Sequence, residues 1–249
     1  MCYHKQDRAL EKNLTDRYNA TIQETYQPLF HENGFNHIAS PVITAENKYT
    51  FRNLHWGLIP FWIKKEADAL QIRTRTLNCI SEEAFEKPAF RQAIRERRCL
   101  IPCTGYFEWR WTNGGKVKYP YFIHTDQFIF SLAGIWSEWE NPVSGQTIGT
   151  YSVLTTRANA LMEKIHNSKK RMPVILPKEY EMDWLNPNLG KEDVLALCEP
   201  YDNSKMNGYT ISRMITDPKA KKNTESIFII FNIIFEFHKH MSKQNGSRT

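Results

Sequence analysis

The segment CLIPCTGYFEWRW, residues 99–111, decides the fold of this chain. It is rich in aromatic and β-branched residues, which favour strands, and it runs into the turn signal Asn113-Gly114-Gly115. Further turn signals at residues 125–126 and 141–145 separate strand-like segments of the same character. These segments are KYPYFIHT (118–125), QFIFSLAGIWSEW (127–139) and IGTYSVLTT (148–156). Successive strands joined by short turns predict a meandering, mostly antiparallel sheet.

Outside these strands, the pattern predicts short helices and a few more strands. Residues 19–55 are irregular apart from an extended piece at 41–44, and two later strands are expected at 172–176 and 209–215. The expected helices are 7–18, a stretch after Ser81, 88–98, 158–166, 179–185 and 192–197. We therefore predict an α+β single domain with a curved, barrel-like, mostly antiparallel sheet flanked by short helices. No strand leads into a glycine-rich helix start, so a dinucleotide or P-loop site is not supported.

The composition narrows the class of protein. The 249 residues carry a formal net charge of +6, which favours an anionic partner such as nucleic acid, although lysines that only aid solubility are the alternative. The five cysteines contain no CxxC pair, so we expect no metal and no cofactor. The N-terminus has no secretory pattern, and the apolar run at 227–237 is shorter than the ~20 residues of a membrane span. We expect a cytoplasmic protein without a membrane partner, whose apolar run forms a strand or a core-facing helix.

Cys2 directly follows the initiator methionine. Removal of Met1 is expected when the second residue is small, and the chain would then begin with an exposed aminothiol. An α-amine has a pKa of about 7.7–8.0, so much of it is neutral near physiological pH. A neutral amine attacks an aldehyde to give an imine, and the adjacent thiol can then close a five-membered thiazolidine ring. Taken alone, a cysteine at this position is more simply explained by chance.

Six segments together favour a functional role for Cys2 over a cysteine that is there by chance. They are Met1-Cys2, WGLIPFW (56–62), TLNCISE (76–82), CLIPCTGYFEW (99–109), AGIW (133–136) and TTRANALMEKIHN running into RMPVIL (155–176). In this order they resemble the SRAP family, the SOS-response-associated peptidase domain that crosslinks to abasic sites in DNA. The resemblance covers roughly residues 2–216. It implies an SRAP domain over 2–222 and an atypical C-terminal tail over 223–249.

The resemblance also implies roles for four residues. Cys2 matches the family's nucleophile, and Asn78, in NCISE, matches the asparagine that holds the amine and the sugar in register. Glu108, in GYFEW, matches the catalytic glutamate, and His166, in IHN, matches the histidine that acts on the sugar. From the residues alone, Asn78 is more simply a turn or cap residue and His166 a histidine at a helix end.

General chemistry fits these roles. Histidine, with a reference pKa near 6.5, suits protonation of the sugar ring oxygen that releases the aldehyde. A carboxylate with a raised pKa can take a proton from the amine and assist loss of water. Because Glu108 stands between Phe107 and Trp109, we expect it to be buried among aromatic rings, although an exposed strand glutamate is the commoner case.

Single-stranded DNA containing an abasic site is the expected partner, bound by a monomer that is associated with the nucleoid when on DNA. A basic groove with aromatic wedges would hold such a strand. We expect Trp62 to stack or wedge beside the site with Pro41 across from it, and Arg171 to contact phosphate. Further cationic candidates are Lys169, Lys170 and the cluster Arg91, Arg95, Arg97 and Arg98, which is otherwise a solvated helix face.

The sequence also departs from the family pattern. Ile80 stands where the family carries an arginine expected to contact DNA, and His4 stands where many members carry arginine. The segment 168–170 lengthens the loop after His166, and its lysines could compensate for the lost charge.

The sequence therefore predicts a DNA-damage protein that crosslinks to abasic sites through a Cys2 thiazolidine and shields them from strand cleavage. Met1 would be removed by the protein itself or by an aminopeptidase. Three alternatives stay open: a cysteine peptidase or amidase that uses Cys2 and His166, a non-covalent nucleic-acid-binding module, and a degenerate member of the family.

Overall fold

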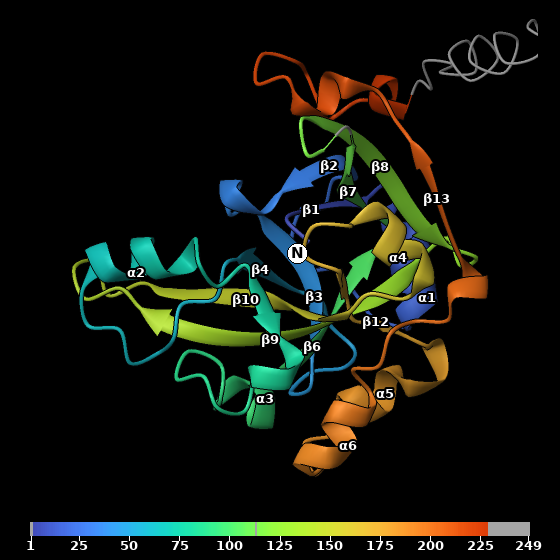
Figure 1. Ribbon diagram of the computed structural model, residues 1–249. Coiled ribbons are helices and arrows are strands. Elements are labelled where there is room, and N and C mark those ends of the chain that lie inside the picture. Colours follow the sequence, from blue (N-terminus) through green and yellow to red (C-terminus); the bar gives the residue numbers. More distant parts are fainter. Residues whose placement is uncertain (1, 113, 229–249) are drawn as a thin grey trace, which may run out of the picture.

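The computed structural model describes residues 2–112 and 114–228 (Figure 1). Five of its strands close into a small barrel: β3 (Ala39–Thr44), β4 (Arg52–Trp56), β6 (Arg98–Cys103), β9 (Phe130–Glu140) and β10 (Thr147–Arg157). β4 pairs with β3, β3 with β6, β6 with β9, and β9 with β10, all antiparallel, and β10 returns to β4 in parallel. The barrel is therefore mixed, with a single parallel seam in the ring.

Three short strands extend the barrel. β5 (Asn78–Ile80) runs parallel to β10, β11 (Arg171–Pro173) is antiparallel to β10, and β12 (Ile175–Leu176) pairs with β9. The segments around Asn78 and Arg171 are thereby attached to the same strand, although they are far apart in the sequence.

A second sheet has five antiparallel strands in the order β13 (Met206–Thr210), β8 (Val117–Thr125), β7 (Gly105–Thr112), β1 (His4–Asp7) and β2 (Leu29–Asn33). β6 of the barrel leads into β7 through Thr104, so the chain passes directly from one sheet to the other. In Figure 1 this second sheet occupies the upper part of the molecule, and β1 lies near the centre. The predicted α+β class and barrel-like sheet are confirmed.

The helices are short and lie around the sheets. They are α1 (Glu11–Tyr18), α2 (Glu66–Arg73), α3 (Ala93–Glu96), α4 (Ala160–Ile165), α5 (Glu181–Trp184) and α6 (Lys191–Ala196), with 3-10 turns η1 (Gly34–Asn36), η2 (Ser81–Glu83), η3 (Lys178–Tyr180), η4 (Asn203–Lys205), η5 (Arg213–Thr216) and η6 (Glu225–Phe228). The Asn159 side chain caps α4 by accepting a hydrogen bond from the backbone N–H of Met162, 3.0 Å away. The helix expected at 88–98 is regular only over α3, and Arg98 already belongs to β6; the strand expected at 209–215 lies earlier, at Met206–Thr210.

β7 separates two hydrophobic clusters because successive side chains of a strand point to opposite faces. Tyr106 belongs to the cluster between the sheets that also holds Cys2, whereas Phe107 and Trp109 belong to a cluster on the outer face. The same alternation places Glu108 on the inner face with Tyr106. The expectation that Phe107 and Trp109 bury Glu108 is therefore wrong, since those rings lie across the strand from it.

The segment after β13 covers the outer face of the second sheet. Ile227 is fully buried beside Phe107, and its carbonyl accepts a hydrogen bond from the backbone N–H of Ser212. The Asn223 side chain accepts a hydrogen bond from the backbone N–H of Phe30, 2.7 Å away on β2. The beginning of the predicted tail is thus packed on the sheet. Residues 229–249, with most of the apolar run at 227–237, lie outside the described residues. No helix within the described part is long and apolar enough to cross a membrane.

Candidate active site

Cys2 lies just before β1 and is completely buried. Its thiol donates to the carbonyl of His4 over 3.7 Å. Burial raises the pKa of this thiol well above its ordinary value, and the neighbouring Glu108 and Cys103 raise it further. The expectation that Cys2 is exposed is therefore wrong. Cys2 packs into the hydrophobic cluster between the sheets, and its sulfur is a neutral thiol at physiological pH.

Glu108 is 4% exposed and lies on the inner face of β7. Burial raises the pKa of its carboxyl group to about 7. Glu108 and Cys2 are close enough for the carboxylate to raise the pKa of the thiol. A carboxyl group with a pKa near 7 can both accept and donate a proton at physiological pH, as a group that serves successive proton transfers must do.

Asn78 begins β5, opposite Val153 of β10. It is 8% exposed, and neither its Nδ2 nor its Oδ1 has a hydrogen-bond partner among the residues that the structure describes. Buried carboxamides are normally hydrogen-bonded, and an unpaired buried group costs about 1–3 kcal/mol. The Asn78 side chain therefore retains a donor and an acceptor for another molecule.

His166 follows α4 and is buried. Its Nδ1 lies 2.8 Å from the carbonyl oxygen of Arg171. Since a carbonyl only accepts, Nδ1 carries the proton, and Nε2 carries the lone pair when the ring is neutral. Burial lowers the pKa of His166 to about 4, against the weaker effect of this hydrogen bond, so the ring is neutral at physiological pH.

One hydrophobic cluster connects these four residues. Cys2 is a member of it, and so are Leu77, Tyr106 and Ile165. Asn78 and His166 directly follow two of these members in the sequence, and Glu108 shares the inner face of β7 with Tyr106. Four segments that are distant in the sequence are thus packed around one core.

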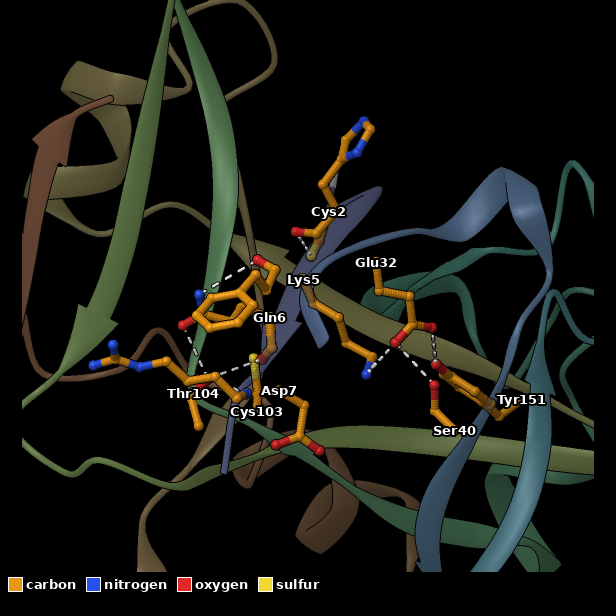
Figure 2. Close-up of polar contacts among 12 residues, drawn as sticks. Cys2, Lys5, Gln6, Asp7, Glu32, Ser40, Cys103, Thr104 and Tyr151 are labelled. Atoms are coloured by element: carbon orange, nitrogen blue, oxygen red, sulfur yellow. Dashed lines mark hydrogen bonds and ion pairs between the residues drawn. The ribbon is translucent and has the colours of Figure 1, made fainter. Parts of the chain in front are cut away.

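A buried ion pair lies beside this core (Figure 2). Lys5 Nζ is 2.7 Å from Glu32 Oε2, and both side chains are 1% exposed or less. Ser40 donates to Glu32 over 2.8 Å, and the Tyr151 hydroxyl donates over 3.4 Å. Burial alone lowers the pKa of Lys5, but the carboxylates of Glu32 and Asp7 outweigh it and raise the pKa. These contacts join β1, the strand that Cys2 leads into, to β2 and to the barrel.

The cationic candidates near His166 differ in their availability. Lys169 and Lys170 are exposed on the loop between His166 and β11. Arg171 is not, because its guanidinium forms two hydrogen bonds to Glu82, of 2.6 and 2.7 Å, and a third to the carbonyl of Thr155. Glu82 therefore occupies the side of Arg171 on which a phosphate would bind.

The other predicted DNA contacts lie elsewhere or are buried. Trp62, 42% exposed, and Arg91 line one small hollow of about 100 Å³ together with Trp136, and none of the four candidate catalytic residues lines it. Pro41 is buried in β3 opposite Asn53, so the prediction that Pro41 faces Trp62 across the DNA is wrong. Arg98 is also buried, and its guanidinium donates to backbone carbonyls, including that of Trp184 at 2.7 Å, so it is not part of a solvated helix face.

His4 does not supply the charge of the arginine found in many family members. Its Nδ1 lies 2.9 Å from Nε2 of His31, and its ring packs against Trp109 with ring centroids 4.8 Å apart. Burial lowers the pKa of His4 to about 3, and the neighbouring His31 lowers it further. His4 is therefore a neutral packing residue on the outer face.

Sequence reasoning missed several residues around the site: Tyr3, Phe35, Glu82 and Asn167. Tyr3 and Asn167 directly follow two candidate catalytic residues, and this adjacency was the only signal for them. No group of three or more metal-ligating side chains occurs within residues 2–112 and 114–228.

The comparisons with known proteins identify the family. The model of the family described as SOS response associated peptidase (SRAP) matches residues 1–218. The chain belongs to the SRAP family. Among curated SRAP relatives, the abasic site processing protein YoqW of Bacillus subtilis is 34% identical over 217 residues, which cover 83% of this chain and 93% of YoqW. The mouse abasic site processing protein HMCES is 29% identical, over 78% of this chain and 60% of its own length.

A crystal structure shows the same architecture. A protein from Bacteroides thetaiotaomicron superposes with a TM-score of 0.85 at 37% identity, covering 92% of this chain and 99% of that one. A protein from Bordetella bronchiseptica has the same fold, with a TM-score of 0.73 at 24% identity.

Proposed function

We propose that this protein processes abasic sites in single-stranded DNA by forming a covalent thiazolidine between Cys2 and the ring-opened sugar. The observation that carries the proposal is the meeting of Cys2, Asn78, Glu108 and His166 around one buried core, with Cys2 and Glu108 in electrostatic contact. Membership of the SRAP family and the likeness to the abasic site processing proteins YoqW and HMCES support the same substrate. The adduct would shield the lesion from strand cleavage by β-elimination.

The chemistry begins after removal of Met1, which leaves Cys2 with a free α-amine. The amine nitrogen attacks the sugar aldehyde to give a carbinolamine, which loses water to form an imine. The thiol sulfur then adds to the imine carbon, and the thiol proton moves to the nitrogen. One aldehyde and one aminothiol thus give one thiazolidine and one water, with no oxidant or reductant.

The electrostatics of the site favour attack by the amine before the thiol. Burial and the neighbouring Glu108 raise the pKa of Cys2, so the sulfur enters as a thiol rather than as a thiolate. A peptidase that uses Cys2 would need the thiolate, because the thiolate is the nucleophilic form. This difference argues against the cysteine peptidase or amidase alternative.

Glu108 is suited to the proton transfers of this sequence. With a pKa near 7, it can accept a proton from the attacking amine and return it to the leaving hydroxyl of the carbinolamine. Asn78 offers its carboxamide to the carbinolamine or to a sugar hydroxyl. His166 is neutral before DNA binds, and the negative charge of an approaching phosphate raises the pKa of a histidine. In this proposal, DNA binding itself charges His166 for donation to the ring oxygen.

A denaturing gel tests the proposal. Purified protein is incubated with a single-stranded oligonucleotide that carries one abasic site, and intact mass shows beforehand whether Met1 has been removed. We expect a heat-resistant shifted band with the processed wild type, no band with Cys2→Ala, and no thiazolidine with Cys2→Ser. Equal bands for wild type and Cys2→Ala would end the proposal. Binding without any adduct would instead favour the non-covalent module.

A further inference from the structure

The rings of Tyr3 and Phe35 form an exposed aromatic pair beside Cys2. Their centroids are 5.2 Å apart with an interplanar angle of 36°. Phe35 is 50% exposed, and Tyr3 is partly exposed. We propose that this aromatic pair stacks against a nucleobase that flanks the abasic site. This inference rests on the proposed function and adds a binding subsite to it.

The exposure of Phe35 does not come from a loose loop. Phe35 lies in η1, where its backbone N–H donates to the side chain of Asn33 over 3.1 Å. The preceding Gly34 donates its N–H to the carbonyl of Tyr3 over 2.8 Å. A Cβ atom at Gly34 would lie only 3.1 Å from the Trp56 ring, so the backbone of η1 rests closely on the core. The structure therefore fixes an apolar ring in a solvent-exposed position.

The aromatic pair adjoins the candidate catalytic residues through Tyr3. Tyr3 directly follows Cys2, and β1 pairs Lys5 with Tyr106 of β7. The same antiparallel register, extended by two residues, places Tyr3 opposite Glu108. Burial raises the pKa of the Tyr3 hydroxyl, and Glu108 and Cys2 raise it further, which agrees with this placement. A nucleotide whose sugar reaches Cys2 would bring its neighbour onto Tyr3 and Phe35.

An unpaired cation lies near the same surface. His37 follows Phe35 by two residues. A Cβ atom at Gly57 would lie 2.9 Å from Nδ1 of His37 and 2.5 Å from the backbone carbonyl of Arg73, so both residues lie against Gly57. Burial lowers the pKa of His37, and the charge of Arg73 lowers it further. Within the described ranges Arg73 has no salt bridge, and its buried Nε and Nη2 have no hydrogen-bond partner. An anionic backbone that passes the aromatic pair would supply the missing counter-ion. An aromatic surface next to a cation is the combination that binds single-stranded nucleic acid.

Affinity measurements test the subsite without the covalent step. The probe is a single-stranded oligonucleotide whose central nucleotide is a tetrahydrofuran abasic analogue, which has no aldehyde. Alanine substitution of a stacking aromatic costs about 1–3 kcal/mol per base, so Phe35→Ala should weaken binding by about 5- to 150-fold. Tyr3→Phe keeps the ring and should bind as wild type. Phe128→Ala removes a ring that is also 50% exposed, at the turn before β9, and is the matched control without effect.

A second set of oligonucleotides identifies the contact. Replacing the flanking base on the stacked side by a further tetrahydrofuran should weaken wild-type binding by the same factor as Phe35→Ala, with no additional loss when both changes are combined. Wild-type affinity for Phe35→Ala, or losses that simply add, would overturn the inference. So would a dimer in sedimentation that Phe35→Ala dissolves, because the rings would then serve a second copy of the chain.

The outcome is separable from that of the proposed function. Suppose that wild type forms no adduct with true abasic DNA, while Phe35→Ala and removal of the flanking base still give non-additive losses of affinity. The covalent proposal then fails and the subsite stands. If the adduct forms normally and the two losses of affinity simply add, only the subsite fails.

Discussion

The carboxamide of Asn167 pairs with both polar backbone groups of Trp111. Its Oδ1 accepts from the Trp111 N–H over 3.0 Å, and its Nδ2 donates to the Trp111 carbonyl over 2.8 Å. The side chain thus takes the place of a neighbouring strand at the end of β7. Asn167 directly follows His166, and Trp111 lies three residues after Glu108. This pair of hydrogen bonds therefore holds the histidine-bearing loop against the strand that carries the glutamate.

We predict that Asn167→Ala slows adduct formation about tenfold at saturating DNA, because a small displacement of His166 weakens its alignment with the sugar. Binding of the tetrahydrofuran oligonucleotide should not change, since Asn167 is a positioning residue in this account. Ser168→Ala, one residue further along the same exposed loop, is the control. A parallel loss of affinity and rate would contradict the positioning role.

The buried Glu108 predicts a pH dependence of stability. The folded protein raises its pKa from 4.5 to about 7, so the folded state binds this proton more tightly than the unfolded chain does. The contribution of this proton to the free energy of unfolding is fully present below pH 4.5 and is lost as the pH rises through about 7. The Gln side chain of Glu108→Gln stays neutral. The free energy of unfolding of this variant should therefore rise relative to that of wild type by up to about 3 kcal/mol over this pH interval. Denaturant unfolding at pH 4.5 and pH 8 measures the difference, and a constant difference would place Glu108 in a polar environment.

The contact between Glu82 and Arg171 predicts a gain of DNA affinity on removal of an acid. Glu82→Gln keeps the shape but loses the charge that holds the guanidinium, which becomes available to phosphate. We expect severalfold tighter binding at low salt, and a salt dependence steeper by about one counter-ion. Glu86→Gln removes an exposed acid that pairs with Lys191 and is the control. Unchanged affinity and slope would mean that Arg171 does not contact DNA.

The buried pair of Lys5 and Glu32 predicts an asymmetric response to mutation. Lys5→Met leaves a carboxylate buried without its cation and should lower the free energy of unfolding by about 3–5 kcal/mol. The double variant Lys5→Met, Glu32→Leu removes both charges and should recover most of this loss. Guanidinium unfolding of the three proteins provides the comparison. A double variant as unstable as the single one would show that the pair contributes through its geometry rather than its charge.

The sequence predicted the strands whose pattern is local. The segment 105–112 forms β7, and its aromatic residues alternate between two faces as a strand requires. β1 and β2 were not predicted because HKQD and LFHEN are rich in polar residues, some of which are buried against each other, such as Lys5 with Glu32. The parallel pairing of β10 with β4 and β5 was equally out of reach, because it joins segments that are distant in the sequence.

For the site, the four candidate catalytic residues came from the family resemblance, and their roles stay predictions. Their environment could not be predicted from the sequence. The pKa of His166 near 4 comes from burial after α4, and the pKa of Cys2 is raised first by burial and then by Glu108 of β7. The placement of Pro41 across from Trp62 was wrong because a proline in an extended segment gives no indication of which face of the strand is covered.

The two faces of β7 have an evolutionary consequence. Tyr106 and Glu108 face the core that holds Cys2, whereas Phe107 and Trp109 face the C-terminal cover that includes Ile227. In homologues that end earlier, odd-numbered positions of this strand should drift toward polar residues together, while the even-numbered ones stay fixed. The two faces of this eight-residue strand would then vary independently, the inner face with the core around Cys2 and the outer face with the C-terminal cover.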